Sequence, residues 1–260
     1  MPLVMWPGCM TGGIFMNAVS GSVRRITTSA VFLSLSLVLN TTLTFDLPLF
    51  GQHGMRIGIS GIFSILPALL FGQGYGASVS GLSDFIGFLH TSTGGYLPLL
   101  TVSAAAGGFL RGFLWEILKK KEDKRMRLLI AAVSGVLLVL GLGSALMMGE
   151  GMTPTAAGAA GGALLGMLLL AADFILSKKI LPGGEKRKLP QLLIVMIVSG
   201  LAVTTVNTVI LRETICTAWK TLPFIVVWLP RAAEELLGNI VLTCFAAVLL
   251  PLSGKFVKNG

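Results

Sequence analysis

Long apolar segments separated by short basic loops constrain this chain more than any other feature of its sequence. Only 12% of the residues are charged and 54% are hydrophobic, whereas a soluble globular domain carries about 25% charged residues. A surface with half of that charge would not stay hydrated, so the chain is expected to be integral to a membrane. This composition excludes a cytosolic enzyme, a secreted disulfide scaffold and a disordered chain.

Eight segments are expected to cross the bilayer, because a spanning helix needs roughly 20 mostly apolar residues. The second of them is short, contains Pro67, and is separated from the third only by the turn at Gly72–Gly74. The eight predicted spans are 26–45, 57–72, 75–90, 97–118, 128–148, 154–177, 190–211 and 223–251.

The positions of the 20 lysines and arginines orient these spans. With the N-terminus inside, most of them fall in the chain ends and in two inner loops, 119–127 and 178–189. The outer segments hold only Arg56, Arg212 and Lys220. Cytoplasmic loops carry the excess of basic residues in membrane proteins. An even number of spans with both termini in the cytoplasm is therefore predicted, and the net charge of +9 does not indicate nucleic-acid binding.

The sequence offers few parts for metal, redox or nucleotide chemistry. Cys9, Cys216 and Cys244 have no paired spacing, so neither a disulfide framework nor a zinc site is indicated. The chain has two histidines, His53 and His90, and no Walker A loop for ATP hydrolysis. We expect no metal site, no cofactor and no catalytic residues.

Charged residues within membrane spans are site candidates by default. Asp84 is expected to be hydrogen-bonded in a packing or capping role, and Arg111 to snorkel toward the inner surface. Arg231, Glu234 and Glu235 share one helical face or adjoin it. They form either a self-neutralised cluster that lines a polar cavity, or a site where Arg231 meets an anionic ligand.

Paired glutamates in a membrane helix also resemble the glutamic intramembrane proteases related to CAAX-processing enzymes, whose pattern is Glu-Glu-x-x-x-Arg. Here Asn239 replaces that arginine, and neither histidine lies deep in a long span. A protease is therefore a weak alternative. An independent secondary carrier or channel is another, although no inverted repeat is visible between the halves.

A series of short motifs in a fixed order spans residues 56–118 and resembles the substrate-binding S components of energy-coupling factor (ECF) vitamin transporters, most closely their folate family. The upstream segment 30–39 resembles the first helix of that family, and Asn207, Thr208 and Arg231 resemble signatures of its fifth and sixth helices. The resemblance covers 26–118 and 190–251. Its motifs are Arg56-Ile57-Gly58-Ile59-Ser60, Pro67-Ala68-Leu69-Leu70-Phe71-Gly72, Tyr75-Gly76, Gly81-x-x-Asp84-x-x-Gly87, Gly94-Gly95-Tyr96-Leu97-Pro98-Leu99-Leu100-Thr101 and Gly107-Gly108-Phe109-Leu110-Arg111-Gly112.

The resemblance implies an all-α integral membrane fold with a six-helix core. This chain adds a two-helix hairpin, 128–177, which brings the total to eight spans with both termini cytoplasmic. The resulting division is an N-terminal tail 1–25, helices one to four in 26–118, inserted basic loops and hairpin in 119–189, and helices five and six in 190–260.

The resemblance further implies a subunit of the plasma membrane that captures a vitamin outside, folate or a related heterocycle. A transmembrane coupling subunit and two ATPase subunits would then drive its delivery inward. Arg56, Tyr96, Thr101, Asn207 and Arg231 are the implied substrate-binding residues, and Ala30 and Ser34 would face the coupling subunit. Leu97–Leu100 departs from the pattern Phe-Pro-Gly-Phe of the folate family. The two glutamates beside Arg231 would also disfavour the doubly negative folate. Another vitamin or small heterocycle therefore remains an alternative substrate.

Overall fold

The structure, a computed structural model, describes residues 11–42, 44–49, 52–58, 61–91, 95–122, 124–132, 134–135, 167–168, 171, 188–221 and 224–258. Most of the predicted hairpin 128–177 lies outside these residues. The elements in chain order are α1 (Thr11–Thr42), β1 (Thr44–Leu49), β2 (Gln52–Gly58), α2 (Gly61–Phe71), α3 (Gln73–Thr91), α4 (Pro98–Leu118), α7 (Leu189–Thr214), the 3₁₀ helix η3 (Thr217–Thr221) and α8 (Phe224–Lys258).

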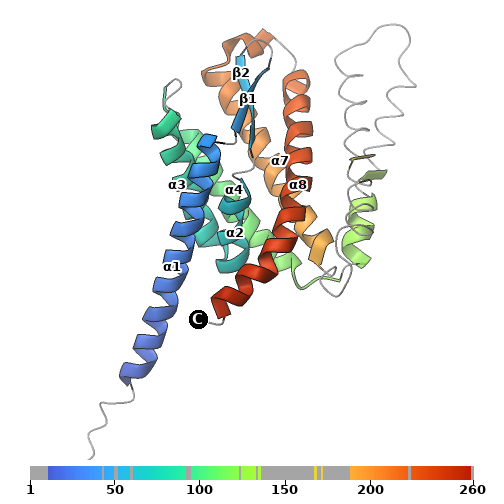
Figure 1. Cartoon of the computed structure of the whole chain (residues 1–260). Coiled ribbons are helices and arrows are strands. Elements are labelled where there is room, and N and C mark those ends of the chain that lie inside the picture. The colour runs from blue at the N-terminus through green and yellow to red at the C-terminus, as the bar shows by residue number, and fades with distance from the viewer. Residues whose placement is uncertain are drawn as a thin grey trace, which may run out of the picture.

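The helices run up and down in one bundle (Figure 1). The start of α1, the corner between α2 and α3, the end of α4 and the end of α8 lie at one end of the bundle, and η3 and the β1–β2 hairpin lie at the other. Lys119–Lys121 follow α4 at the first end, which we call the inner end in keeping with the predicted sidedness. The two ends of the described chain thus share the end that carries this basic loop.

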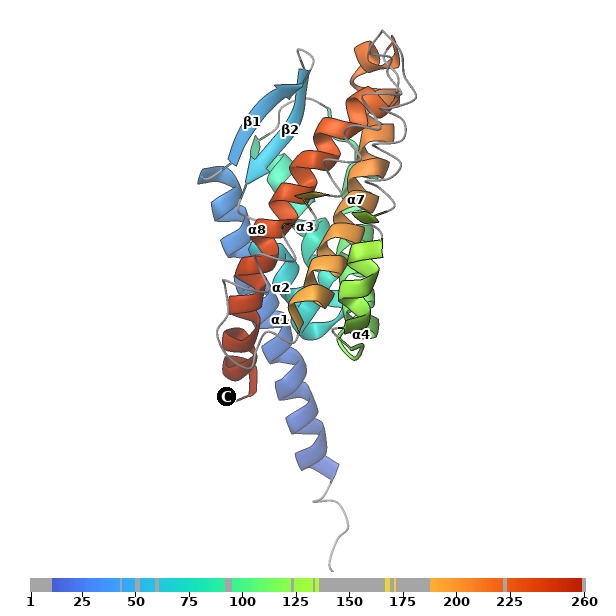
Figure 2. The same ribbon diagram turned by 90° about the vertical axis from the view of Figure 1, so that its right-hand side faces the viewer.

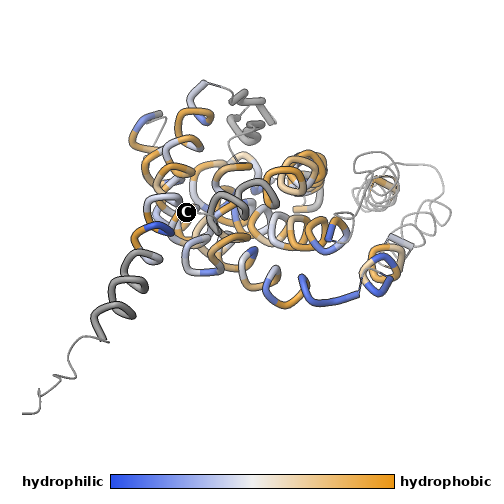
Figure 3. The backbone as a smooth tube through the Cα atoms, turned by 60° about the horizontal axis from the view of Figure 1, so that its bottom comes forward, coloured by the Kyte–Doolittle hydropathy of each residue, from blue (hydrophilic) through white to orange (hydrophobic). Residues whose placement is uncertain are grey.

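Three helices in the described ranges are long and apolar enough to cross a membrane, within Gly21–Thr42, Leu189–Thr214 and Val227–Leu250. Seen from the inner end, hydrophobic residues make up most of the bundle helices, and hydrophilic residues gather where the chain leaves α4 (Figure 3). The expected helical, membrane-integral fold class is confirmed. The total of eight spans and the cytoplasmic termini stay predictions. Of the predicted hairpin, Ile130 and Leu168 pack against a buried cluster that α7 and α8 share.

The α1–α2 connection differs from the predicted spans 26–45 and 57–72. Helix α1 ends at Thr42, and the chain then forms an antiparallel hairpin in which Thr44 pairs with Gly58 and Asp46 pairs with Arg56. The Thr41 and Thr42 hydroxyls both donate to the Val38 carbonyl, which competes with continuation of the helix. The register shifts between Leu47 and Pro48, because proline cannot donate to the ladder.

Small residues allow α3 and α4 to pack with their backbones close together. A Cβ atom on Gly108 would overlap the Gly76 carbonyl, and one on Gly112 would lie 2.5 Å from the Gln73 Cα atom. Without a hydrophobic driving force between helices in lipid, such close approach supplies much of their attraction. The glycine- and serine-rich segment 73–91 is therefore helical because of what it packs against, despite the low helix propensity of glycine.

The close α3–α4 contact predicts opposite outcomes for two alanine substitutions. Gly108→Ala should lower the free energy of unfolding by about 1–3 kcal/mol, because its Cβ atom meets backbone that cannot move aside. Gly74→Ala is the matched control, since a Cβ atom there has no neighbour within 4 Å. Denaturant titration in detergent micelles measures both changes, and equal values for the two variants would contradict the close packing.

Candidate functional site

Helix α2 is short, and the β1–β2 hairpin precedes it in the outer half of the bundle. The 11 residues of α2 rise about 16 Å, roughly half of the ~30 Å hydrocarbon core of a bilayer. Beyond Gly61 the chain continues toward the outer end as β2, which contacts α8 (Figures 1 and 2). Non-helical backbone at membrane depth is tolerated only where protein buries it or where it lines a cavity. The hairpin backbone in this outer half therefore needs either protein packing or a polar cavity around it.

An apolar cluster fills the inner half of the bundle below this region. Its members come from α2, α4, α7 and α8, and each is no more than 6% exposed. The part of the bundle near the inner end is therefore packed with apolar side chains. The inner plug consists of Ile65, Leu69, Trp115, Leu192, Val195, Met196 and Ala246.

Polar side chains of α7 and α8 meet directly above this inner plug. The Thr204 hydroxyl donates to Glu235 Oε2 at 3.1 Å, and the Asn239 amide donates to Glu235 Oε1 at 2.9 Å. A Cβ atom on Gly200 would overlap both the Glu235 carboxylate and the Asn239 amide. Glycine is therefore required at this point of α7 for the Glu235 carboxylate to be held between the two helices.

Arg111 of α4 reaches the same region from the other side. Its Nε donates to the Ser199 hydroxyl at 3.3 Å, and the negative charge of Glu235 attracts the half-buried guanidinium. The interpretation that Arg111 snorkels to the inner surface is wrong, because Ser199 holds it inside the bundle. Arg111, Ser199 and Thr204 were not among the predicted site residues. The four-residue spacing of Glu235 and Asn239, and the small polar residues in mid-span on α7, were the available signals.

Asn207 lies on α7, one turn closer to the outer end than Thr204. Its Oδ1 accepts a hydrogen bond from the Ser103 hydroxyl of α4, which fixes the orientation of the amide. Among the described residues the Asn207 Nδ2 group has no acceptor, and the side chain is half-buried. Its two N–H bonds can thus be donated to a ligand carbonyl.

Tyr96 and Thr101 come together at the outer part of the α3–α4 seam. The Tyr96 hydroxyl donates to Thr101 at 3.0 Å, and the Thr101 hydroxyl donates to Asp84 Oδ2 at 2.6 Å. The Tyr96 ring packs against Phe85 and Phe88. Asp84 is hydrogen-bonded between two helices, as the sequence predicted, and both predicted ligand-binding hydroxyls already have partners there.

Arg231 of α8 lies beneath the connection from α7. Its guanidinium carbon is 5.7 Å from the ring centroid of Trp219, which is fully buried in η3. Glu234 and Glu235 attract its charge. The neighbouring Trp228 donates from Nε1 to the Thr205 hydroxyl at 2.9 Å and joins α8 to α7. Arg231 thus contacts an aromatic ring and has two carboxylates nearby.

The other predicted residues lie apart from these contacts. Arg56 is in β2 opposite Asp46, at the outer end of the bundle. Ala30 and Ser34 are exposed on α1, where the Ser34 hydroxyl donates to the Ala30 carbonyl at 3.0 Å. The five predicted substrate-binding residues therefore all belong to the outer half. The structure joins Tyr96 with Thr101 and holds Asn207 and Arg231 at separate helix contacts.

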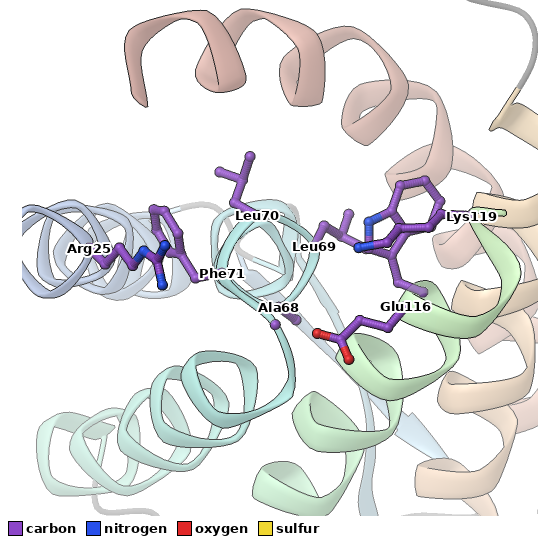
Figure 4. Close-up of a pocket in the computed structure, with 9 residues that line it drawn as sticks. Arg25, Ala68, Leu69, Leu70, Phe71, Glu116 and Lys119 are labelled. Atoms are coloured by element: carbon purple, nitrogen blue, oxygen red, sulfur yellow. The ribbon is translucent and has the colours of Figure 1, made fainter. Parts of the chain in front are cut away.

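A cavity of about 160 Å³ lies at the opposite, inner end of the bundle (Figure 4). Gly72, with φ of +96°, forms the corner where α2 ends and α3 begins. Glu116 Oε1 is 2.8 Å from the position of a Cβ atom on Gly72, close to the first N–H groups of α3, and Arg25 and Lys119 line the cavity at the end of α2. Carboxylates near helix starts and cations near helix ends complement the helix dipoles. These charges are thereby explained without a ligand.

Within the described residues, no three His, Cys, Asp or Glu side chains converge as a metal site.

The Thr101–Asp84 contact predicts a measurable coupling between the two side chains. In a double-mutant cycle, Thr101→Val and Asp84→Ala should show a coupling energy of about 1.5–3 kcal/mol, as for hydrogen bonds to charged groups. Unfolding of the four proteins in detergent measures it. Additive effects would show that the hydrogen bond does not stabilise the α3–α4 seam and would return Thr101 to the list of ligand-binding candidates.

Cys216, beyond the outer end of α7, should react slowly with maleimides in the folded protein. Burial raises the pKa of its thiol, although the charge of Arg231 opposes this, so little thiolate forms at pH 7. With Cys9→Ser and Cys244→Ser, Cys216 is the remaining cysteine of the three. Its labelling should accelerate in denaturant and at a pH above the usual range for thiols. Rapid labelling of the native protein at pH 7 would contradict the burial.

The chain matches one family of known membrane proteins. A family model described as "ECF-type riboflavin transporter, S component" matches residues 20–172, more than half of the 260 residues. No curated protein matches the chain. The match takes in α1 to α4 and continues through most of the segment predicted as an insertion. It names riboflavin and not folate, and members of this family are membrane-embedded transport subunits, so the protease alternative is set aside. The chain belongs to the S components of ECF transporters, in the riboflavin transporter family.

Proposed function

We propose that this S component captures an uncharged heterocyclic vitamin, with riboflavin as the first candidate, in the outer half of its bundle. The observation that carries the proposal is the division of the bundle interior. Polar side chains of α4, α7 and α8 occupy the outer half, and the inner plug closes the other half. Such a division suits a subunit that takes up its ligand from the outer side and holds it until a partner allows release.

The charges of the site favour riboflavin over folate. Glu235 accompanies Arg111, and Glu234 accompanies Arg231. A folate would add two carboxylates to a region where the cations already have counter-charges, and a buried charge without a counter-charge is strongly unfavourable. Riboflavin is uncharged at neutral pH and offers ring carbonyls, a ring N–H and hydroxyl groups. The family model names the same vitamin.

Individual residues provide the contacts that such a ligand needs. The Nδ2 group of Asn207 can donate to a ring carbonyl. Arg231 can donate to a carbonyl or a hydroxyl while it remains over Trp219. Arg56 of β2 and Tyr96 stay candidates on the outer side, where an aromatic ring can stack on the flat heterocycle.

Energy for import would come from partner subunits, since the chain has no Walker A loop. The partners proposed are a transmembrane coupling subunit and two ATPase subunits. Ala30 and Ser34 would provide the contact with the coupling subunit. Both are small and exposed one turn apart on α1, so a second helix could approach closely there. The division of the chain into a core and an inserted hairpin, 128–177, belongs to the same proposal.

Purified protein should bind riboflavin, measured by quenching of flavin fluorescence. Asn207→Leu and Arg231→Gln should each weaken binding about tenfold or more, because each removes a donor from a largely desolvated site. Arg212→Gln is the matched control: Arg212 donates to the Lys220 carbonyl at the outer end and should not contact the ligand. Absence of riboflavin binding by the unmodified protein would refute the proposed substrate.

Uptake should require the partner subunits. Proteoliposomes that hold this chain alone should not accumulate riboflavin, and those that also hold a coupling subunit and ATPases should do so with ATP. Accumulation against a gradient by the chain alone would instead favour an independent carrier.

A further inference from the structure

Side chains of two helices hold Glu235 in place. Two donors from different helices, Thr204 and Asn239, hydrogen-bond to its two oxygens. Gly200 leaves the space that its carboxylate fills. Arg111 lies on the other side of the Ser199–Gly200 step of α7 and is attracted by its charge. The arrangement is built from three helices, α4, α7 and α8.

The Arg111 and Glu235 side chains lie at the inner boundary of the outer half. Glu235 is about 16 Å along α8 from its outer end at Phe224, at about 1.5 Å per residue. Arg111 is one helical turn from Trp115, a member of the inner plug. Side chains of both residues are half-buried and not sealed off. Together they form the floor of the region in which a ligand is proposed to bind.

Arg111 and Glu235 offset each other, and Arg231 also lies close enough to attract Glu235. Without Glu235, Arg111 would keep its charge at this depth with no carboxylate acting on it among the described residues, which costs several kcal/mol. With both present, an additional anion would meet the Glu235 carboxylate and find no cation without a partner on the floor. An uncharged group meets no such penalty and can still accept a hydrogen bond from Arg111.

We infer that Arg111 and Glu235 determine specificity as a charge-balanced floor that admits an uncharged vitamin and rejects analogues bearing an extra anionic group. This inference rests on the proposed function and deepens it. It assigns the choice between neutral and anionic ligands to two residues that the sequence motifs of the family resemblance did not select as ligand-binding. It also explains why α7 has glycine at position 200, since any side chain there would displace the Glu235 carboxylate.

Changing one partner at a time should move selectivity in opposite directions. The quantity to measure is the Kd of an anionic flavin divided by the Kd of riboflavin, by fluorescence titration of the purified chain. Two anionic flavins are used. Flavin mononucleotide carries its charge on the side chain, and 8-carboxyriboflavin carries its charge on the ring. One of the two charges therefore faces the floor whichever end of the ligand points inward. Glu235→Gln leaves Arg111 without its counter-charge and should lower the ratio about tenfold for at least one of them, because like-charge contact across an interface costs several kcal/mol.

Arg111→Met should raise the same ratio, since it removes one of the two arginines that offset the charge of Glu235. The double variant Arg111→Met/Glu235→Gln restores neutrality and should return the ratio to within about threefold of the unmodified protein, a rescue that a merely structural role would not give. Glu213→Gln is the control, because Glu213 bridges to Lys220 at the exposed outer end. Where Glu235→Gln does not fold, the ratio for Arg111→Met decides alone.

The outcomes separate this inference from the function on which it rests. Loss of riboflavin binding in the unmodified chain would refute the proposed function. Riboflavin binding with ratios unchanged, within about twofold, in both single variants and for both anionic flavins would overturn the inference and leave the proposed function standing.

Discussion

A lipid bilayer leaves no backbone polar group to be satisfied by water, and the rest of this structure depends on that constraint. It favours helices in the candidate spans within Gly21–Thr42, Leu189–Thr214 and Val227–Leu250, where each helix satisfies its own backbone groups. It also makes the exception informative. Where α2 stops short and β2 continues toward the outer end, the chain is non-helical, and such backbone is tolerated only where protein buries it or where it lines a cavity.

Two kinds of contact join the helices of the bundle: close approach at small residues, and contacts between polar or charged side chains. Gly76 and Gly108 bring α3 and α4 together so closely that little space remains between them. Between α7 and its neighbours α4 and α8, polar contacts accompany close packing, with Ser103 and Asn207 nearer the outer end and Ser199, Thr204 and Glu235 deeper. The proposed ligand site rests on this second group of contacts.

The candidate site was only partly visible in the sequence. Arg231 and the two glutamates stand out because charges in apolar spans are rare, and Asp84 was expected to find a partner between helices, as it does with Thr101. Arg111 was misread, because a cation near the inner third of a span can snorkel or turn inward, and only its neighbours decide. The β1–β2 hairpin was missed because its alternating residues adjoin two apolar runs, so hydropathy alone merged them with the neighbouring helices.

By itself the sequence determined that the chain is a helical membrane protein, since apolar length acts locally and needs no partner, and the placement of its charges predicts a basic inner side. The order of its short motifs also determined the transporter class, which the family match confirms. Only the tertiary structure decided that Arg111 turns inward to Ser199, that Thr204 and Asn239 hold Glu235, and that Tyr96 and Thr101 bond to each other. These facts depend on which faces of α4, α7 and α8 meet, and side chains 124 residues apart in the sequence, as from Arg111 to Glu235, become neighbours only through that packing.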